Sequence, residues 1–132
     1  MNEPRSMKYV ILGDPIPLYR ARFSSISNRM FDSQKEIKLV TGITLVNQHD
    51  NQPVFDGPIY LDIQFFFLTP LRKPKLNKQW HVYRPDLSNL IKFYEDIATT
   101  IIIKDDCIIA KISATKSYDK NARTEFIITE MK

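Results

Sequence analysis

Acidic side chains occur just before and just after one predicted helix. Asp86 stands immediately before an amphipathic stretch, and Asp105 and Asp106 precede the β-type run that follows it. Carboxylate oxygens are the ligands that a hard cation such as Mg²⁺ prefers, and two or three of them suffice for phosphodiester hydrolysis. A helix followed closely by a packed strand can bring its flanking points together, so these aspartates are candidate metal ligands.

The helix predicted from about Leu87 to Thr99 has two contrasting faces at 3.6-residue spacing. Its apolar stripe, which should face the core, is made of Leu87, Leu90, Ile91, Tyr94 and Ile97. Its polar face is made of Ser88, Lys92, Glu95, Asp96 and Thr99, with Asn89 at the edge. Lys92 lies one turn from Ser88 and could stabilise charge on a scissile phosphate. The alternative is an ordinary surface helix in which Lys92 and Asp96 form an i, i+4 ion pair.

A basic segment with interleaved aromatic residues precedes this helix. No acidic residue lies between Asp62 and Asp86, and the cations in that interval are Arg72, Lys73, Lys75, Lys78 and Arg84. Lysine and arginine displace counterions from phosphates, and aromatic faces such as those of Trp80 and Tyr83 stack on unpaired bases. The segment therefore suits a DNA-contacting loop, and a solvated surface loop is the equal alternative. Arg20 and Arg22 would share one face of a short extended piece.

The overall composition favours an anionic partner and argues against several classes of protein. The formal net charge is +4, and three glycines are too few for a Gly-rich phosphate cradle, so no nucleotide cofactor is expected. No run is long enough to span a membrane or resembles a secretion signal, which predicts a cytoplasmic protein without a membrane partner. The single cysteine, Cys107, is expected to be buried in a strand, and His49 and His81 are expected on the surface.

The remaining pattern predicts one compact α+β domain over residues 1–132. Other predicted elements are a helix from Ser33 onward, capped by Asp32 or Ser33, and strands from Lys8 to Leu12, Ile59 to Leu68, Cys107 to Ser117 and Arg123 to Met131. In the third of these strands, one side would carry Ile108, Ala110, Ile112 and Ala114. A turn at 119–122 predicts a hairpin between the last two strands. The sheet should therefore be mostly antiparallel, with two main helices.

Three pieces of the chain together resemble the signature of RusA-like Holliday junction resolvases, a family of crossover junction endodeoxyribonucleases. The pieces are residues 84–92 (RPDLSNLIK), 95–97 (EDI) and 104–109 (KDDCII). In that family an Asp-x-Asp-Asn-Leu-x-Lys segment opens a helix, a further Asp lies on it, and an Asp-Asp pair begins the next strand. Residues 19–23, Lys116 and Tyr118 are similar to further family positions.

The resemblance implies a homodimeric endonuclease that resolves Holliday junctions in branched DNA during recombination and repair, with Mg²⁺ or alternatively Mn²⁺ as cofactor. By this resemblance Asp86 and Asp106 are catalytic, metal-binding aspartates, Asp105 is their acidic neighbour, and Lys92 is a catalytic lysine. Ser88 occupies the position of the second motif aspartate and would ligate the metal without adding charge. The DNA-binding residues would be Arg20, Arg22, Arg72, Lys73, Lys75, Lys78, Arg84 and Lys116.

Ser88 supports a second hypothesis, in which the protein is a branched-DNA-binding module with weakened or lost catalysis. Glu95 or Asp96 could compensate for the missing carboxylate, although each lies about two helical turns, roughly 10–12 Å, from Ser88. A third hypothesis, a structural or protein-interaction domain, leaves the combination of acidic and basic segments unexplained.

Overall fold

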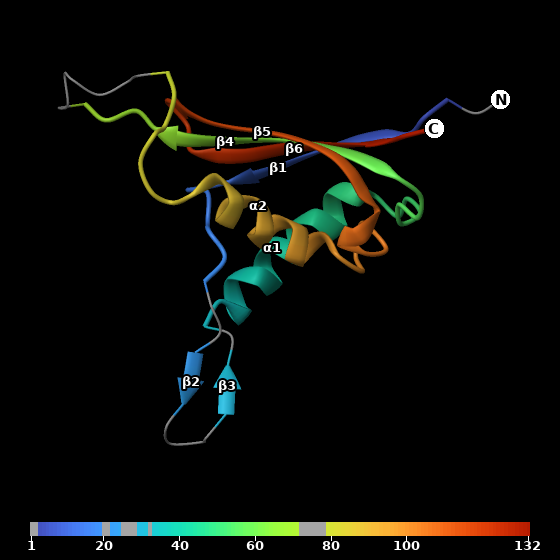
Figure 1. Cartoon of the computed structure of the whole chain (residues 1–132), viewed down its shortest axis with the longest axis horizontal. Coiled ribbons are helices and arrows are strands. Elements are labelled where there is room, and N and C mark those ends of the chain that lie inside the picture. The colour runs from blue at the N-terminus through green and yellow to red at the C-terminus, as the bar shows by residue number, and fades with distance from the viewer. Residues whose placement is uncertain (1–2, 20–21, 25–28, 32, 72–78) are drawn as a thin grey trace.

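Two helices cover one face of a four-stranded sheet in the computed structural model (Figure 1). The structure describes residues 3–19, 22–24, 29–31, 33–71 and 79–132, with only the backbone at 22–24 and 29–31. The arrangement is a compact α+β fold, as the sequence predicts. No helix in these ranges is long and apolar enough to cross a membrane.

The sheet has the strand order β1-β6-β4-β5. Its members are β1 (Ser6–Leu12), β6 (Arg123–Glu130), β4 (Ile59–Leu68) and β5 (Ile109–Asp119). The pairs β1/β6 and β6/β4 are antiparallel, whereas β4 and β5 are parallel. The predicted, mostly antiparallel sheet is therefore confirmed, and it contains one parallel pair. The crossover that joins this pair carries α2 (Leu87–Ala98), which runs back along the sheet as parallel strands require.

The predicted hairpin between the last two strands is wrong, because β4 lies between β5 and β6. The turn itself forms at 119–122, where the Gly13 N–H donates a hydrogen bond to the Ala122 carbonyl over 3.1 Å. After that turn the chain passes to the far side of β4 instead of folding back on β5. Local turn residues predicted the reversal of direction correctly, but they carry no information about which strand occupies the neighbouring place.

The other helix, α1 (Lys35–His49), packs against β1 and α2. Its N-cap residue is Gln34, so the predicted cap at Asp32 or Ser33 is wrong. The buried Gln34 amide instead accepts a hydrogen bond from the Tyr19 N–H and donates one to the Pro17 carbonyl. A two-stranded ribbon, β2 (Arg22–Ser24) with β3 (Arg29–Phe31), precedes α1.

His49, predicted on the surface, is buried at the end of α1. Its Nδ1 lies 2.5 Å from the Tyr9 hydroxyl, and its Nε2 lies 3.1 Å from the Pro53 carbonyl oxygen. Burial raises the pKa of Tyr9 to about 12 and so keeps its phenol protonated. His49 therefore links β1 to the loop after α1, and its role is structural.

The core lies between the sheet and the helices. On β4 every second residue from Ile59 to Phe65 is buried, which confirms the predicted alternation. From α2 the buried residues are Leu90, Phe93, Tyr94, Ile97 and Ala98. Phe93 was absent from the predicted stripe, yet it is fully buried. The apolar face of α2 is thus wider than the sequence suggested. Its burial leaves a narrower polar face, which is exposed to solvent.

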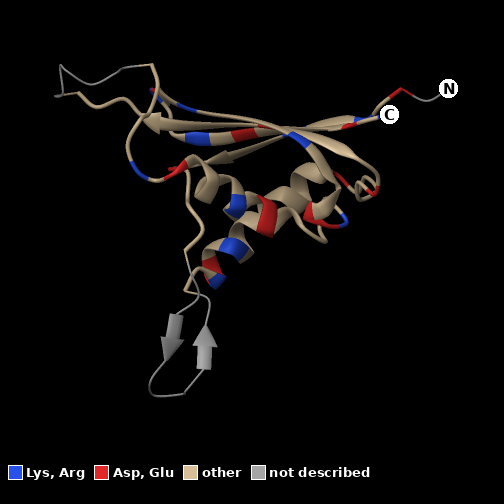
Figure 2. Ribbon diagram, viewed as in Figure 1, with Lys and Arg blue, Asp and Glu red and all other residues tan. Residues whose placement is uncertain are grey.

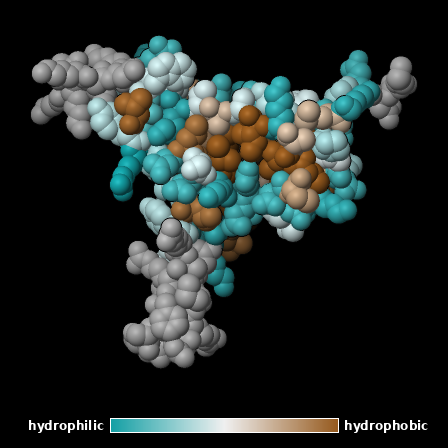
Figure 3. Space-filling view, in the orientation of Figure 1, coloured by the Kyte–Doolittle hydropathy of each residue, from teal (hydrophilic) through white to brown (hydrophobic). Residues whose placement is uncertain are grey.

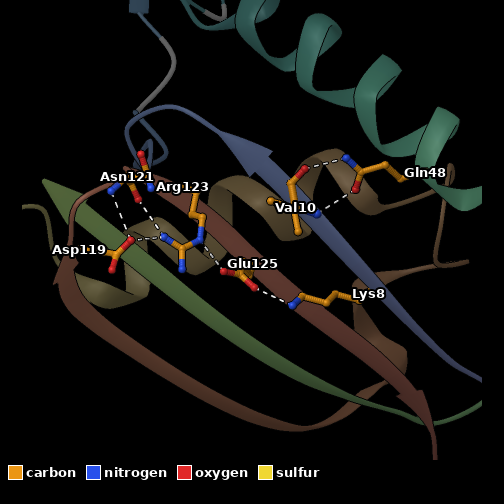
Figure 4. Close-up of polar contacts among 7 residues, drawn as sticks. All are labelled: Lys8, Val10, Gln48, Asp119, Asn121, Arg123 and Glu125. Atoms are coloured by element: carbon orange, nitrogen blue, oxygen red, sulfur yellow. Dashed lines mark hydrogen bonds and ion pairs between the residues drawn. The ribbon is translucent and has the colours of Figure 1, made fainter.

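The opposite face of the sheet carries a row of paired charges (Figure 4). Glu125 lies 2.8 Å from Lys8 and 2.5 Å from Arg123, and Arg123 also contacts Asp119. The Arg123 guanidinium lies 3.9 Å from the centre of the Phe66 ring. These two cations and two anions offset one another, so the row itself adds no net positive charge to this face.

Candidate metal and DNA-binding site

Asp86 is the N-cap residue of α2, as predicted, but its carboxylate makes no capping hydrogen bond. Its backbone carbonyl accepts from the Asn89 and Leu90 N–H groups at 3.1 and 3.2 Å, and this contact starts the helix. The side chain is exposed at the positive end of the helix dipole. The carboxylate is therefore free of a structural role in the cap and is available to an external ligand.

Lys116 of β5 holds the turn that leads to Asp86. Its Nζ donates hydrogen bonds of 2.8 Å to the carbonyls of Tyr83 and Pro85. Burial lowers the pKa of Lys116, and the nearby charge of Asp86 partly opposes that effect. Two of the three ammonium N–H groups are used in these contacts, which leaves one for a phosphate.

The polar face of α2 is exposed as predicted. Ser88, Lys92 and Asp96 are exposed at i, i+4 and i+8, and so they form one line along the helix. Asp96 pairs with Lys38 of α1 at 3.0 Å, so the ion pair of Asp96 in the structure is with α1 and not with Lys92. Glu95 is half-buried, and its pKa is raised by burial and then by the charge of Asp106, against a smaller opposing effect of Lys92.

Asp105 caps, and Asp106 begins, a single 3-10 turn, Asp106–Ile108, between α2 and β5. The Asp105 carboxylate accepts a hydrogen bond from the Cys107 N–H at 3.3 Å. The two carboxyls interact with each other, which lowers the pKa of Asp105 and raises that of Asp106. Cys107 is exposed, so its predicted burial in a strand is wrong: the extra turn delays the start of β5 to Ile109.

The structure does not bring the two acidic points of one chain together. The 12 residues of α2 between them span about 18 Å. Asp106 interacts with Glu95 and Asp96 at one end of α2, whereas Asp86 interacts with Lys116 at the other. Among the described residues no group of three or more His, Cys, Asp or Glu side chains could hold a metal ion. The donor types fit Mg²⁺, but a single chain does not assemble them.

Most of the predicted DNA-binding cations lie outside the described residues. These are Arg20, Arg72, Lys73, Lys75 and Lys78, together with the side chain of Arg22. Arg84 is described and is exposed, two residues before Asp86. The positions that can be placed, Arg84 and Lys116, therefore lie at the Asp86 end of α2.

An aromatic cluster beside that end was missed by the sequence analysis. The His81 ring stacks on Phe67 with centroids 4.0 Å apart and lies 5.2 Å from Tyr118. His81 was predicted on the surface and is half-buried; burial and then the charge of Lys116 lower the pKa of its ring. These rings come from β4, β5 and the segment before α2, and no local spacing connects them.

Comparison with known proteins identifies the family of this chain. The sequence model of endodeoxyribonuclease RusA matches residues 13–129. The chain belongs to the RusA endodeoxyribonuclease family. The crossover junction endodeoxyribonuclease rusA of Lactococcus phage r1t is 36% identical over 75 residues, or 56% of each chain. The uncharacterized protein YqaN of Bacillus subtilis (strain 168) is 27% identical over 138 residues, covering 95% of this chain and 96% of that protein.

The RusA match includes both acidic points, Lys92 and all the predicted DNA-binding cations. The resemblance found in the residues of the sequence is thereby confirmed at the level of the family. RusA-family membership makes the exposed carboxylates at the two ends of α2 the best candidates for the chemistry of this protein.

Proposed function

We propose that this RusA-family protein is a divalent-metal-dependent endonuclease that resolves four-way DNA junctions in recombination and repair. The observation that carries the proposal is the Asp86 carboxylate, which is exposed and makes no hydrogen bond to the start of α2. The exposed pair Asp105 and Asp106 follows the other end of the same helix, in a chain of the RusA family. The protein acts as a homodimer of single-domain chains, each domain comprising residues 1–132, in the cytoplasm.

The proposed roles follow from the chemistry of each group. Asp86 and Asp106 are the principal ligands, and Asp105 and Ser88 assist them. The oxygen donors suit Mg²⁺ and accept Mn²⁺, and such an ion orients water and offsets charge on the phosphate. Lys92 stands on the exposed line of α2 and stabilises the negative charge that develops during cleavage.

DNA binding is proposed for the cations of the basic segment and for those beside Asp86. The full set is Arg20, Arg22, Arg72, Lys73, Lys75, Lys78, Arg84 and Lys116. Support comes from Lys116, which interacts with the Asp86 carboxylate, and from the exposed Arg84 two residues before Asp86, where a bound backbone would present its scissile phosphate. The neighbouring aromatic rings offer faces on which a base can stack.

Incubation with a labelled four-way junction tests the function directly. We expect paired nicks in the presence of Mg²⁺, no nicks in EDTA, and far slower cleavage of a linear duplex of the same sequence. Denaturing electrophoresis of all four labelled strands measures the nicks and their symmetry. An intact junction at every Mg²⁺ and Mn²⁺ concentration would refute the nuclease proposal.

Neutralising Lys73, Lys75 and Lys78 together should weaken junction binding and lower the slope of log affinity against log salt by about two to three. Each lysine that contacts a phosphate releases about one counterion, so the decrease in the salt slope gives the number of phosphate contacts that the variant has lost. Fluorescence anisotropy between low and moderate salt measures it. A matched variant that neutralises the exposed Lys8, Lys35 and Lys120 removes the same charge elsewhere and should keep its slope.

The second candidate function is a branched-DNA-binding module that has lost cleavage, and Ser88 favours it. At this exposed position a hydroxyl stands where the family motif has an aspartate, so one anionic ligand is missing. The junction assay separates the candidates, because a binding module shifts the junction in a gel and leaves all four strands intact.

A further inference from the structure

Two hollows lie on either side of the turn that leads to Asp86. One is a groove of about 540 Å³, lined by Arg84, Asp86 and part of the segment 15–19. The other, which we call the aromatic cavity, has a volume of about 490 Å³ and is lined by residues that include Asp14, Phe67, His81, Tyr83 and Tyr118. Its volume lies within the range of roughly 300–1,000 Å³ that is usual for ligand sites. Consecutive residues line the two hollows, so a ligand that reaches Asp86 can extend into the aromatic cavity.

Backbone hydrogen bonds fix the walls of the aromatic cavity to the sheet. The His81 N–H donates to the Lys116 carbonyl over 3.0 Å, and the Tyr118 N–H donates to the Gln79 carbonyl over 3.3 Å. The His81 ring stacks on Phe67 near the end of β4, with centroids 4.0 Å apart. Because β4, β5 and the segment before α2 are joined in this way, the cavity is formed before any ligand enters it, which lowers the entropic cost of binding.

Stability alone does not explain this arrangement of side chains. The His81 Nδ1 atom is buried and makes no hydrogen bond of ordinary length among the described residues. A buried polar atom without a partner opposes folding, and such atoms are rare in native proteins. In the same segment Trp80, Val82 and Tyr83 are 45%, 65% and 55% exposed. Neighbouring large apolar side chains that stay exposed indicate a binding surface.

The surface around the aromatic cavity mixes apolar and polar groups. Figure 3 shows hydrophobic and hydrophilic residues interspersed beside the end of β4, whereas a continuous hydrophobic band lies nearer the middle of the molecule. Inside the cavity the rings are accompanied by the carboxylate of Asp14 and by the hydroxyl groups of Tyr83 and Tyr118. A planar ligand with apolar faces and hydrogen-bonding edges matches this mixture, and a nucleobase is such a ligand.

Lys116 connects the aromatic cavity to the Asp86 carboxylate. Burial and then the charge of Lys116 lower the pKa of His81, and the same ammonium group interacts with Asp86. Arg84 adds an exposed cation two residues before Asp86. Figure 2 shows basic and acidic positions close together where this segment enters α2. The two cations can therefore hold a phosphate at Asp86 while the base of the same nucleotide reaches the cavity.

We propose that the aromatic cavity receives one unstacked nucleobase of the DNA strand whose phosphate lies at Asp86. The proposal deepens the proposed function and rests on it. A base in a continuous duplex can enter the cavity only after it unstacks and unpairs, whereas a base at a branch point has already lost part of its stacking. The cavity therefore favours branched DNA over a linear duplex, and it does so through contacts with the base and not through charge.

Photochemical cross-linking tests where the base lies. A single 5-iodouracil is placed in turn at each nucleotide next to the branch point of a four-way junction, and the wild-type protein binds the junction in EDTA so that no strand is cut. Irradiation joins the iodouracil to an aromatic side chain on which it stacks, and mass spectrometry identifies that residue. We expect a cross-link to His81, Tyr83 or Tyr118 from the junction and none from a linear duplex of the same sequence. The absence of a cross-link to these rings from every junction position would overturn the proposal.

Affinity measured by fluorescence anisotropy gives a second test with matched controls. Tyr83→Leu removes an exposed ring without changing the charge and should weaken junction binding about tenfold, while Tyr83→Phe keeps the ring and should bind as wild type does. Affinity for a linear duplex and the salt slope should not change, because no cation is lost. Tyr60→Leu removes a ring at the other end of β4, about 23 Å from Phe67, and should bind the junction normally. Wild-type junction affinity in Tyr83→Leu, or an equal loss for junction and duplex, would refute the cavity.

Cleavage in Mg²⁺ distinguishes failure of the cavity from failure of the proposed function. If the wild-type protein nicks the junction but iodouracil never joins these rings, the cavity is refuted and the nuclease stands. If the protein binds without nicking, the nuclease proposal fails, and the cross-links still decide the cavity. A junction that lacks the cross-linked base completes the test: wild type should bind it as weakly as Tyr83→Leu binds the intact junction, and Tyr83→Leu should bind it no more weakly. Additive losses would show that the ring and the base do not meet.

Discussion

Replacing Asp106 by asparagine is expected to abolish metal-dependent cleavage of a four-way junction and to leave junction binding intact or tighter. The carboxamide keeps the shape of the side chain but loses the anionic oxygen that a hard cation prefers. Removal of one negative charge also reduces repulsion of the phosphate backbone. Because Asp106 is exposed and starts only a short turn, its loss should not unfold the protein.

The rate with saturating Mg²⁺ should fall below about one-thousandth of wild type. Anisotropy in EDTA measures binding, and thermal unfolding measures stability. Asp50→Asn is a suitable control, because Asp50 is also exposed and its left-handed backbone conformation (φ 55°) tolerates asparagine. Undiminished cleavage by the Asp106→Asn protein would remove Asp106 from the mechanism, and an equal loss in both variants would point to a general effect of charge.

Elements with a local pattern were predicted well from the sequence. β4 was predicted at its observed bounds because it is central in the sheet, and burial of one face makes every second residue apolar from Ile59 to Phe65. α2 was predicted to within a residue because it combines an aspartate at the N-cap position with a strong amphipathic period. In both elements the environment of each residue depends on the element's own periodicity, which the sequence shows directly.

Most of the structural predictions that were wrong depended on contacts between segments distant in the sequence. The place of β4 between β5 and β6 depends on the crossover through α2, and no residue in the turn at 119–122 encodes it. His49 was assigned to the surface because its partner, Tyr9, lies 40 residues earlier in the chain. In β5 the register shifts at Ala110, because Ile59 pairs with Ile109 but Tyr60 pairs with Lys111. The face predicted for Ile108 and Ala110 therefore did not continue to Ile112, which is exposed.

The sequence indicated candidate residues for the site but not their geometry, and their roles stay predictions. Asp86, Lys92 and Asp106 were selected because residues 84–92 and 104–109 together resemble the RusA-like motif, whereas the helix pattern alone also fits an ordinary surface helix. Their separation follows from topology: α2 crosses from the end of β4 to the start of the parallel β5, so it must run the length of the sheet. A crossover helix therefore places its two flanking points at opposite ends of the strands, whatever residues occupy them.

Ser88→Asp should lower the Mg²⁺ concentration required for half-maximal cleavage, on the order of tenfold, if the protein is an active nuclease with a weakened metal site. The substitution restores the anionic ligand of the family motif. Position 88 is exposed in the first turn of α2, which contains no acidic residue. A carboxylate there complements the helix dipole by roughly 0.3–1 kcal/mol, so the fold should tolerate it.

Mg²⁺ titrations of junction cleavage distinguish the outcomes, with Ser88→Asn as the control that changes size without adding charge. A binding module with further defects in its site would stay inactive at every Mg²⁺ concentration in both variants. An increased Mg²⁺ requirement in Ser88→Asp would show that the present site depends on the hydroxyl, with Glu95 or Asp96 supplying the missing charge. Combining Ser88→Asp with Asp96→Asn would reveal that dependence: a compensating Asp96 becomes dispensable once residue 88 carries a charge, whereas in the wild-type background its loss raises the Mg²⁺ requirement.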